Sequence, residues 1–218
     1  MGDEQSMLGA LIMAASKRSS AVGFTLIELL VVMVLMSILI ALVAPSFTDT
    51  IALQRLRGAH DQLATDVQFT RTEAARLGTF VHLRVQPKAA GKDACYIIFS
   101  DTYADAALRN FSTPCDCTLP AGSRCPSSGS SPTTRELKTV TLAAFTGLDL
   151  AAINLSQVGF DPVTGMMLAR TYDLMPAPKE FIVDTLLDSP RRLQLQVGFT
   201  GRVRVCAPAG STIKATAC

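Results

Sequence analysis

The sequence contains few of the residues that metal sites and catalytic sites use most. Only two histidines, His60 and His82, occur among its 218 residues, and each is expected to be a surface or packing residue rather than a ligand. No segment carries a nucleophile elbow, a metal-binding histidine pair or a glycine-rich phosphate loop. The sequence therefore predicts a protein that is not an enzyme and that holds no metal or cofactor.

A large excess of one charge is also missing. The 20 Lys and Arg residues and the 18 Asp and Glu residues give a net charge of +2, so the charge of the whole chain offers no argument for nucleic-acid binding. Any charge signal must be local. Residues 179–218 hold such an excess, with six basic side chains against three acidic ones, a difference of +3. The basic residues are Lys179, Arg191, Arg192, Arg202, Arg204 and Lys214, and the acidic ones are Glu180, Asp184 and Asp188.

The sequence does contain six cysteines, one of them the last residue. They are expected to form disulfides outside the cytoplasm. The alternative is a metal site, because three cysteines lie close together with a fourth upstream, but their spacing lacks the paired C-x-x-C knuckles of structural zinc sites. The disulfide candidates are Cys95, Cys115, Cys117, Cys125, Cys206 and Cys218, and their connectivity stays open.

A long apolar run occupies residues 24–44, FTLIELLVVMVLMSILIALVA. As a helix it spans about 30 Å, the thickness of the hydrocarbon core of a membrane. Lys17 and Arg18 precede it, and Asp49 comes before any basic residue beyond it. The positive-inside rule then predicts a single pass of the inner membrane with a cytoplasmic amino end and a periplasmic head. A cleaved secretory signal is the competing interpretation, but the small residue Gly23 precedes the run instead of following it.

Residues 23–30, G-F-T-L-I-E-L-L, resemble the processing site of type IV pilins and pseudopilins. The resemblance implies that a membrane prepilin peptidase cleaves between Gly23 and Phe24, and that the new amino group on Phe24 is methylated. The cleaved leader is then residues 1–23, or a leader of eleven residues if translation starts at Met13.

Glu28 is the only formal charge in the apolar run, and it matches the acidic residue that pilins keep near the new terminus. A carboxylate inside hydrocarbon is costly unless it is paired. The resemblance therefore implies a contact with the terminal amine of a neighbouring subunit during filament assembly. The alternative is an interfacial carboxylate that reaches the lipid headgroups.

Beyond the apolar run, apolar residues recur at close to helical spacing. Residues 45–78 are therefore expected to form an amphipathic continuation of the helix, with Gly78 as its terminator. Pro45 is expected to bend or locally open the helix as it leaves the membrane. The polar face is expected to be solvated or to face another subunit. It comprises Arg55, Arg57, Asp61, Asp66, Arg71, Glu73 and Arg76.

From residue 79 the pattern changes to short segments of β-branched and alternating apolar residues. The expected strands cover residues 79–85, 95–100, 137–145, 153–160, 181–187, 191–199 and 202–206. The stretch 110–134 is rich in Ser, Pro, Gly and Cys and is expected to be a disulfide-pinned surface loop. The predicted fold class is α+β: a long amino-terminal pilin helix with a transmembrane half and an amphipathic half, followed by a β-rich globular head over residues 79–218.

Two segments resemble the FimT and GspH subfamily of minor pilins and pseudopilins: TRTEAARLG at residues 70–78 and QVGFTGRVRVC at residues 196–206. FimT-type pilins are similar in carrying a G-R-x-R motif near the carboxyl terminus. The resemblance implies that this motif binds DNA during natural transformation. It stands here as Gly201, Arg202, Val203 and Arg204.

The physical case for this motif is independent of the resemblance. Side chains two apart on a strand share a face at about 6.6 Å separation, so Arg202 and Arg204 are expected to project together while Val203 and Val205 face the core. Such a pair can bridge successive phosphates, and without base-edge contacts its binding is salt-sensitive and independent of base sequence. The alternative is the solvated face of an edge strand.

Two other features of this region support the predicted site. Gly201 is expected to permit the turn between strands that end at Thr200 and start at Arg202. A disulfide between Cys206 and Cys218 would close a tail loop beside the arginines. The other basic members of the predicted DNA-binding site are Arg191, Arg192 and Lys214, of which the last lies in that loop.

Two functions remain open from the sequence. The first is a minor type IV pilin that joins a pilus with other pilins and binds DNA non-specifically for natural transformation. The alternative is a GspH-like pseudopilin of a type II secretion system, which would use the same surface for protein contacts alone.

Overall fold

The computed structural model describes residues 23–101, 115–125, 134–142, 147–169 and 180–218. The described chain forms two compact units, Met1–Phe47 and Thr48–Cys218. Some sequence predictions fall outside the described residues. They are the leader before Gly23 with Met13, Lys17 and Arg18, the basic residue Lys179, and residues 110–114 and 126–133 of the predicted loop.

The first unit contains the start of helix α1 (Leu26–Leu77). The first turn is capped, because the backbone amide of Glu28 donates a hydrogen bond to the hydroxyl of Thr25 at 3.3 Å. The large apolar side chains from Phe24 to Ile40 are between 47 and 83% exposed. This part of the helix therefore leaves its apolar surface uncovered within a single subunit.

The course of α1 bears on three predictions. Among the described residues, no helix is long and apolar enough to cross a membrane, so the single pass over residues 24–44 stays a prediction. The helix continues through Pro45, and the bend there also stays a prediction. It ends at Leu77, where Gly78 has a φ of 65° and donates its amide to the Ala74 carbonyl at 3.0 Å. This is the left-handed glycine cap that a terminating glycine is expected to form.

Nine strands follow α1 in the described part of the chain. They are β1 (Phe80–Gln86), β2 (Cys95–Asp101), β3 (Thr134–Thr141), β4 (Asp149–Ala152), β5 (Gln157–Phe160), β6 (Met167–Ala169), β7 (Glu180–Leu186), β8 (Arg192–Gly198) and β9 (Val203–Cys206). The sequence predicts all of these strands except β4 and β6, the latter only three residues long.

The strands form two antiparallel sheets. The five-stranded sheet has the order β3-β2-β1-β5-β6, and the four-stranded sheet has the order β4-β7-β8-β9. The fold class is therefore α+β, with an amino-terminal helix followed by an antiparallel β head, as the sequence predicts.

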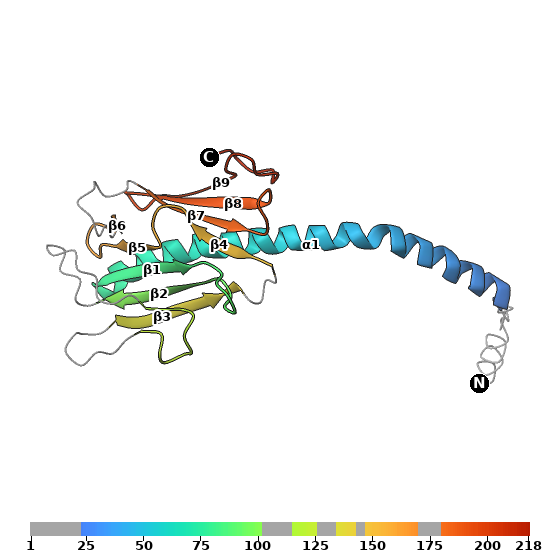
Figure 1. Ribbon diagram of the computed structural model, residues 1–218, viewed down its shortest axis with the longest axis horizontal. Coiled ribbons are helices and arrows are strands. Elements are labelled where there is room, and N and C mark those ends of the chain that lie inside the picture. The colour runs from blue at the N-terminus through green and yellow to red at the C-terminus, as the bar shows by residue number, and fades with distance from the viewer. Residues whose placement is uncertain (1–22, 102–114, 126–133, 143–146, 170–179) are drawn as a thin grey trace, which may run out of the picture. The chain divides into compact units, whose positions relative to one another are not determined.

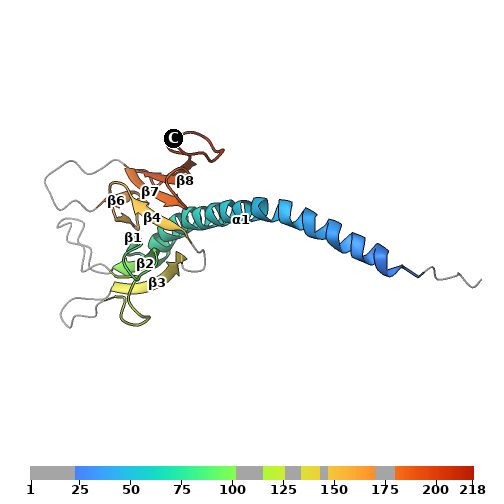
Figure 2. The ribbon, with the colours of Figure 1, turned by 45° about the vertical axis from the view of Figure 1, so that its right-hand side comes forward.

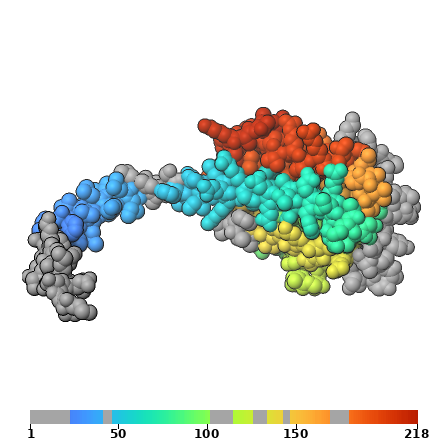
Figure 3. Space-filling view, turned by 180° about the vertical axis from the view of Figure 1, so that it is seen from behind, coloured from blue at the N-terminus to red at the C-terminus, as the bar shows by residue number. Residues whose placement is uncertain are grey.

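One hydrophobic core lies between the second half of α1 and both sheets. Leu56, Leu63 and Val67 of α1 are fully buried, as are Phe160 of β5 and Phe181 of β7. Figures 1 and 2 show the second half of α1 running along the strands, with β7 and β8 on one side of it and β1 to β3 on the other. Seen from behind in Figure 3, the helix lies at the surface between the two groups of strands. One stripe of α1 therefore supports both sheets.

Asp66 of α1 is buried, with 3% of its surface exposed. Its carboxylate accepts hydrogen bonds from the hydroxyl of Tyr96 in β2 and from the ammonium group of Lys138 in β3, each at 2.7 Å. The prediction that Asp66 belongs to a solvated or subunit-facing surface is therefore wrong. Its partners come from strands 30 and 72 residues away, which a helical pattern does not show.

Both histidines are packing residues. His60 of α1 is fully buried, and its Nδ1 lies 3.0 Å from the hydroxyl of Thr185 in β7. His82 of β1 is also fully buried, with its ring centroid 5.3 Å from that of Phe99. A Cβ atom on Gly159 of β5 would lie only 2.4 Å from the His82 ring. A glycine therefore makes room for the imidazole between adjacent strands.

Three disulfides join the six cysteines. The pairs are Cys95–Cys117, Cys115–Cys125 and Cys206–Cys218, and no cysteine is free. All six cysteines are therefore paired in disulfides, as the sequence predicts.

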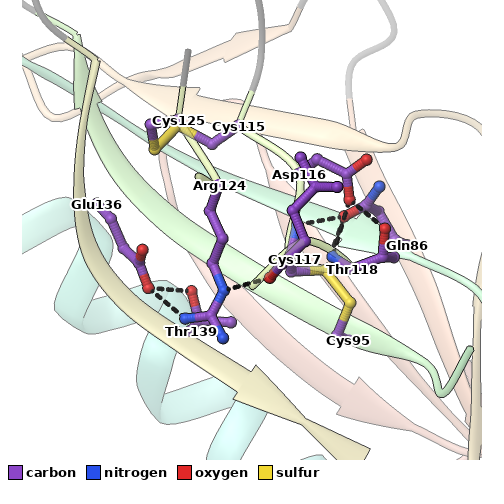
Figure 4. A network of polar contacts seen from close by, with 11 residues as sticks. Gln86, Cys95, Cys115, Asp116, Cys117, Thr118, Arg124, Cys125, Glu136 and Thr139 are labelled. Carbon is purple, nitrogen blue, oxygen red and sulfur yellow. Dashed lines mark hydrogen bonds and ion pairs between the residues drawn. A yellow bond between two sulfur atoms is a disulfide. The ribbon is translucent and has the colours of Figure 1, made fainter. Parts of the chain in front are cut away.

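The disulfide Cys95–Cys117 attaches residues 115–125 to β2, and the disulfide Cys115–Cys125 closes that segment on itself. Ile97 and Phe99 pack beneath them in a small second cluster, so every residue of β2 is buried. Figure 4 shows that Arg124 of this segment donates to Glu136 of β3, at 2.7 Å. The segment therefore acts as a cover over one face of the five-stranded sheet.

Candidate functional site

The G-R-x-R motif lies at the tip of the β8–β9 hairpin. The amide of Gly198 donates to the carbonyl oxygen of Arg202 at 2.9 Å, and the amide of Gly201 donates to the Gly198 carbonyl at 2.8 Å. Because β8 ends at Gly198 and β9 starts at Val203, the turn is longer than the predicted boundaries at Thr200 and Arg202 allow.

Arg202 and Arg204 are both exposed, and Val203 between them is partly buried against the core. Within the described ranges, neither arginine has a carboxylate at ion-pair distance. Val205 lies on the same face as Val203, as predicted, because it pairs with the buried Leu195, but it is 38% exposed. The reason is that β9 is an edge strand, paired with β8 on one side only, so no further strand covers it.

Two features of the structure require glycine at position 201, its backbone conformation and the lack of room for a side chain. Its φ is 77°, and a Cβ atom there would lie 2.9 Å from the carbonyl oxygen of Gly165 and 3.2 Å from Cδ of Arg71. A Cβ atom on Gly165 would in turn lie 2.9 Å from Nε of Arg71. The side chain of Arg71, from α1, therefore lies against two glycines and ties the helix to the hairpin tip. Sequence reasoning missed this contact because it assigned Arg71 to a solvated or subunit-facing surface.

This contact predicts that Gly201→Ala is more destabilising than Gly210→Ala. Gly210 has a φ of 82° and nothing within 4 Å of an added Cβ. Alanine at Gly210 is therefore expected to lower the free energy of unfolding by about 1 kcal/mol, from the strain of the left-handed backbone conformation alone. Alanine at Gly201 must also displace the Gly165 carbonyl, for a total of about 2–3 kcal/mol. Chemical denaturation of the full chain in detergent measures both, and equal losses would show that the tip has room for a side chain.

The carboxyl-terminal tail folds back on the hairpin. The disulfide Cys206–Cys218 closes it, and Arg204 donates from Nη2 to the carbonyl of Ala217 at 3.1 Å. Lys214 is exposed in the resulting loop. The tail carbonyl occupies one guanidinium nitrogen of Arg204, so the tail orients this side chain.

Arg191 and Arg192 lie at the opposite end of the hairpin from Arg202. The six residue steps of β8 from its first residue to its last correspond to roughly 20 Å. Arg191 forms ion pairs with Asp188 and with Asp49 of α1, the latter at 3.3 Å. The hydrogen bond between Arg191 and Asp188 lowers the pKa of the Asp188 carboxyl and raises the pKa of Arg191.

The second arginine of this pair also has partners. Arg192 donates to the carbonyl of Ala209 at 2.9 Å and lies 3.8 Å from the buried carboxylate of Asp184. The structure therefore does not group Arg191 and Arg192 with the motif arginines. The sequence prediction grouped them with Arg202 and Arg204 because they are close in sequence, but they lie beside the β7–β8 turn.

The processing residues lie at the start of the described part of the chain. Phe24 is 81% exposed, and Gly23 precedes it outside the helix. Glu28 stands three residues after the capping Thr25, where a carboxylate also favours the positive end of the helix dipole. The pattern T-x-x-E at residues 25–28 is a sequence signal for this helix cap, and the sequence analysis does not use it.

The prokaryotic N-terminal methylation motif matches the chain at residues 23–44. The chain thus carries a prokaryotic N-terminal methylation motif at the start of a long helix that is followed by an antiparallel β head, the combination of features found in type IV pilin-like proteins.

Among solved structures, the type IV minor pilin FimU of Pseudomonas aeruginosa strain PAO1 is similar at 14% sequence identity. The match covers 74% of this chain and 95% of that chain, with a TM-score of 0.43. No curated protein matches the sequence. The FimT and GspH subfamily stays a prediction.

Proposed function

We propose that this chain is a minor type IV pilin that binds DNA without sequence specificity through Arg202 and Arg204. The observation that carries the proposal is that both guanidinium groups are exposed at one hairpin tip and that neither is ion-paired within the described part of the chain. Arginine binds phosphate oxygens through two parallel hydrogen bonds. The tail loop adds the exposed Lys214.

Maturation and assembly complete this proposal. A prepilin peptidase removes residues 1–23, and the amine of Phe24 is methylated. Residues 24–44 anchor the subunit in the inner membrane with the leader in the cytoplasm, while residues 45–78 continue the helix into a periplasmic head. Glu28 pairs with the terminal amine of a neighbouring pilin when the subunit enters the filament.

The test is binding of the full-length protein, in detergent, to random-sequence duplex DNA across a salt series. The expected result is an affinity that falls steeply with salt, because phosphate contacts release counterions. The variant Arg202→Ala, Arg204→Ala is expected to bind at least tenfold more weakly at low salt. The slope of log K against the logarithm of the salt concentration is expected to fall in magnitude by about 2, because two phosphate contacts are lost.

A matched control removes the same charge elsewhere. Arg57 on α1 and Lys88 after β1 are both exposed, and Arg57→Ala, Lys88→Ala is expected to leave the affinity within about twofold of the parent, a difference below about 0.5 kcal/mol. Equal losses in the two double variants would mean that only net charge matters, and the hairpin tip would no longer be the site.

The second candidate is a GspH-like pseudopilin of a type II secretion system with protein contacts alone. The ion pairs of Arg191 and Arg192 favour it, because they leave less unpaired charge than the sequence predicts. No DNA binding by the parent at low salt, even at high micromolar concentration, would select this candidate.

A further inference from the structure

The hairpin tip combines its arginines with exposed apolar side chains. Phe199, in the turn between β8 and β9, is 54% exposed. Val163 and Met166, in the turn between β5 and β6, are 91% and 41% exposed. The two turns are joined, because the amide of Met167 donates to the carbonyl of Phe199 at 2.8 Å. A phenyl ring that could gain about 1.5–3 kcal/mol from burial thus stays in solvent next to the cationic motif.

The backbone beneath this ring is held on several sides. Gly198, directly before Phe199, bonds to both Gly201 and Arg202. The Arg71 side chain fills the space beside Gly201 and links the turn to α1. Because the backbone is fixed, a flat partner that stacks on the ring has to order only the side chain and not the turn that carries it.

We infer that Phe199 is a stacking platform for an unpaired nucleobase, so that the site prefers single-stranded DNA over duplex DNA. This inference rests on the proposed function, since Arg202 and Arg204 supply the phosphate contacts. An aromatic ring beside a positively charged surface is the combination that single-strand binding proteins use. In a duplex the base faces are already stacked on one another and only their edges are accessible. Only an unpaired base can therefore offer its face to Phe199.

The first experiment compares an oligothymidylate with a duplex of equal length at one low salt concentration, with full-length protein in detergent. The parent is expected to bind the single strand more tightly. Phe199→Ala is expected to weaken single-strand binding about fivefold or more and to leave duplex binding unchanged. Phe199→Tyr retains a ring and is expected to bind like the parent. Val163→Ala removes a more exposed apolar side chain of the same surface and is expected to change neither affinity.

A second measurement does not depend on a loss-of-function variant. The chain has no tryptophan, so Phe199→Trp introduces a single indole at the tip. Its fluorescence is expected to be quenched by oligothymidylate and not by the duplex.

The outcomes separate this inference from the proposed function. If the parent binds neither DNA, both are overturned. If it binds DNA through Arg202 and Arg204 but Phe199→Ala leaves single-strand affinity unchanged, the proposed function stands and the stacking inference is wrong. The inference is equally overturned if bound oligothymidylate does not quench the indole of the Phe199→Trp variant, or if Phe199→Ala alters only self-association of the chain.

Discussion

Replacing Asp66 with alanine is expected to lower the free energy of unfolding by about 3 kcal/mol. Removing one partner of a buried ion pair typically costs about 3–5 kcal/mol, because the other charge stays buried without compensation. The lower end applies here, because the Lys138 side chain is 39% exposed and can recover some hydration. The Tyr96 hydroxyl is buried and loses its acceptor. Burial and the hydrogen bond to Asp66 raise the pKa of this tyrosine, so it stays a neutral donor.

Denaturant unfolding of the full chain in detergent measures this loss. Asp66→Asn keeps an acceptor for Tyr96 and is expected to lose only about 1–2 kcal/mol. Lys138→Met removes the cation alone, and the double variant Asp66→Ala, Lys138→Met removes the whole pair. The double variant is expected to be less destabilised than the sum of the single ones. A loss below about 1 kcal/mol for Asp66→Ala would show that the buried carboxylate is not a main attachment of α1 to the five-stranded sheet.

Acidification is expected to destabilise the head through His60. Burial lowers the pKa of this imidazole to about 4, although Asp61 nearby acts in the opposite direction. In the unfolded chain the pKa of a histidine is about 6.5. Between that pH and about 4, the imidazole is therefore protonated in the unfolded state but stays neutral in the folded state. Stability contributed by neutral His60 is therefore complete above about pH 6.5 and is lost as the pH falls toward 4. The full effect is about 3 kcal/mol.

The check is the free energy of unfolding of the parent and of His60→Gln between pH 7 and pH 4. Glutamine can still bond to Thr185, but it does not titrate. The difference between the two proteins is expected to shrink by about 3 kcal/mol over this range, because carboxylates that titrate in both cancel. A difference that is constant with pH would mean that His60 takes up its proton in the folded state as easily as in the unfolded one.

The sequence predicts α1 and most strands because their patterns are long and regular. The apolar stripe of α1 has helical spacing, and Gly78 marks its end. Strands β4 and β6 have four and three residues, which is too few for alternation to be visible. The burial of Asp66 could not be predicted, because polarity alone cannot separate a solvated carboxylate from one that meets Tyr96 and Lys138 across the fold.

The candidate site shows the same limit. The motif at residues 201–204 is local, so the sequence places it correctly on a hairpin. Arg191 is only eleven residues from Arg202 in sequence, but a hairpin arm carries it to the far end, where Asp49 and Asp188 pair with it. The contact of Arg71 with Gly165 and Gly201 depends on three distant segments, which no single pattern contains.

The edge strands of the two sheets determine whether head domains of neighbouring chains can lie close together without pairing their strands. In the described part of the chain these strands are β3, β6, β4 and β9, and all but β3 have only three or four residues. β3 is longer, but it carries Arg135, Glu136 and Lys138, and its register shifts partway along. Beyond β9 the disulfide-closed tail pairs Ala207 with Ala217. Such short, charged or irregular margins offer a poor template for strand addition by another chain. Heads held at high local concentration can therefore remain separate folded bodies while their helices associate.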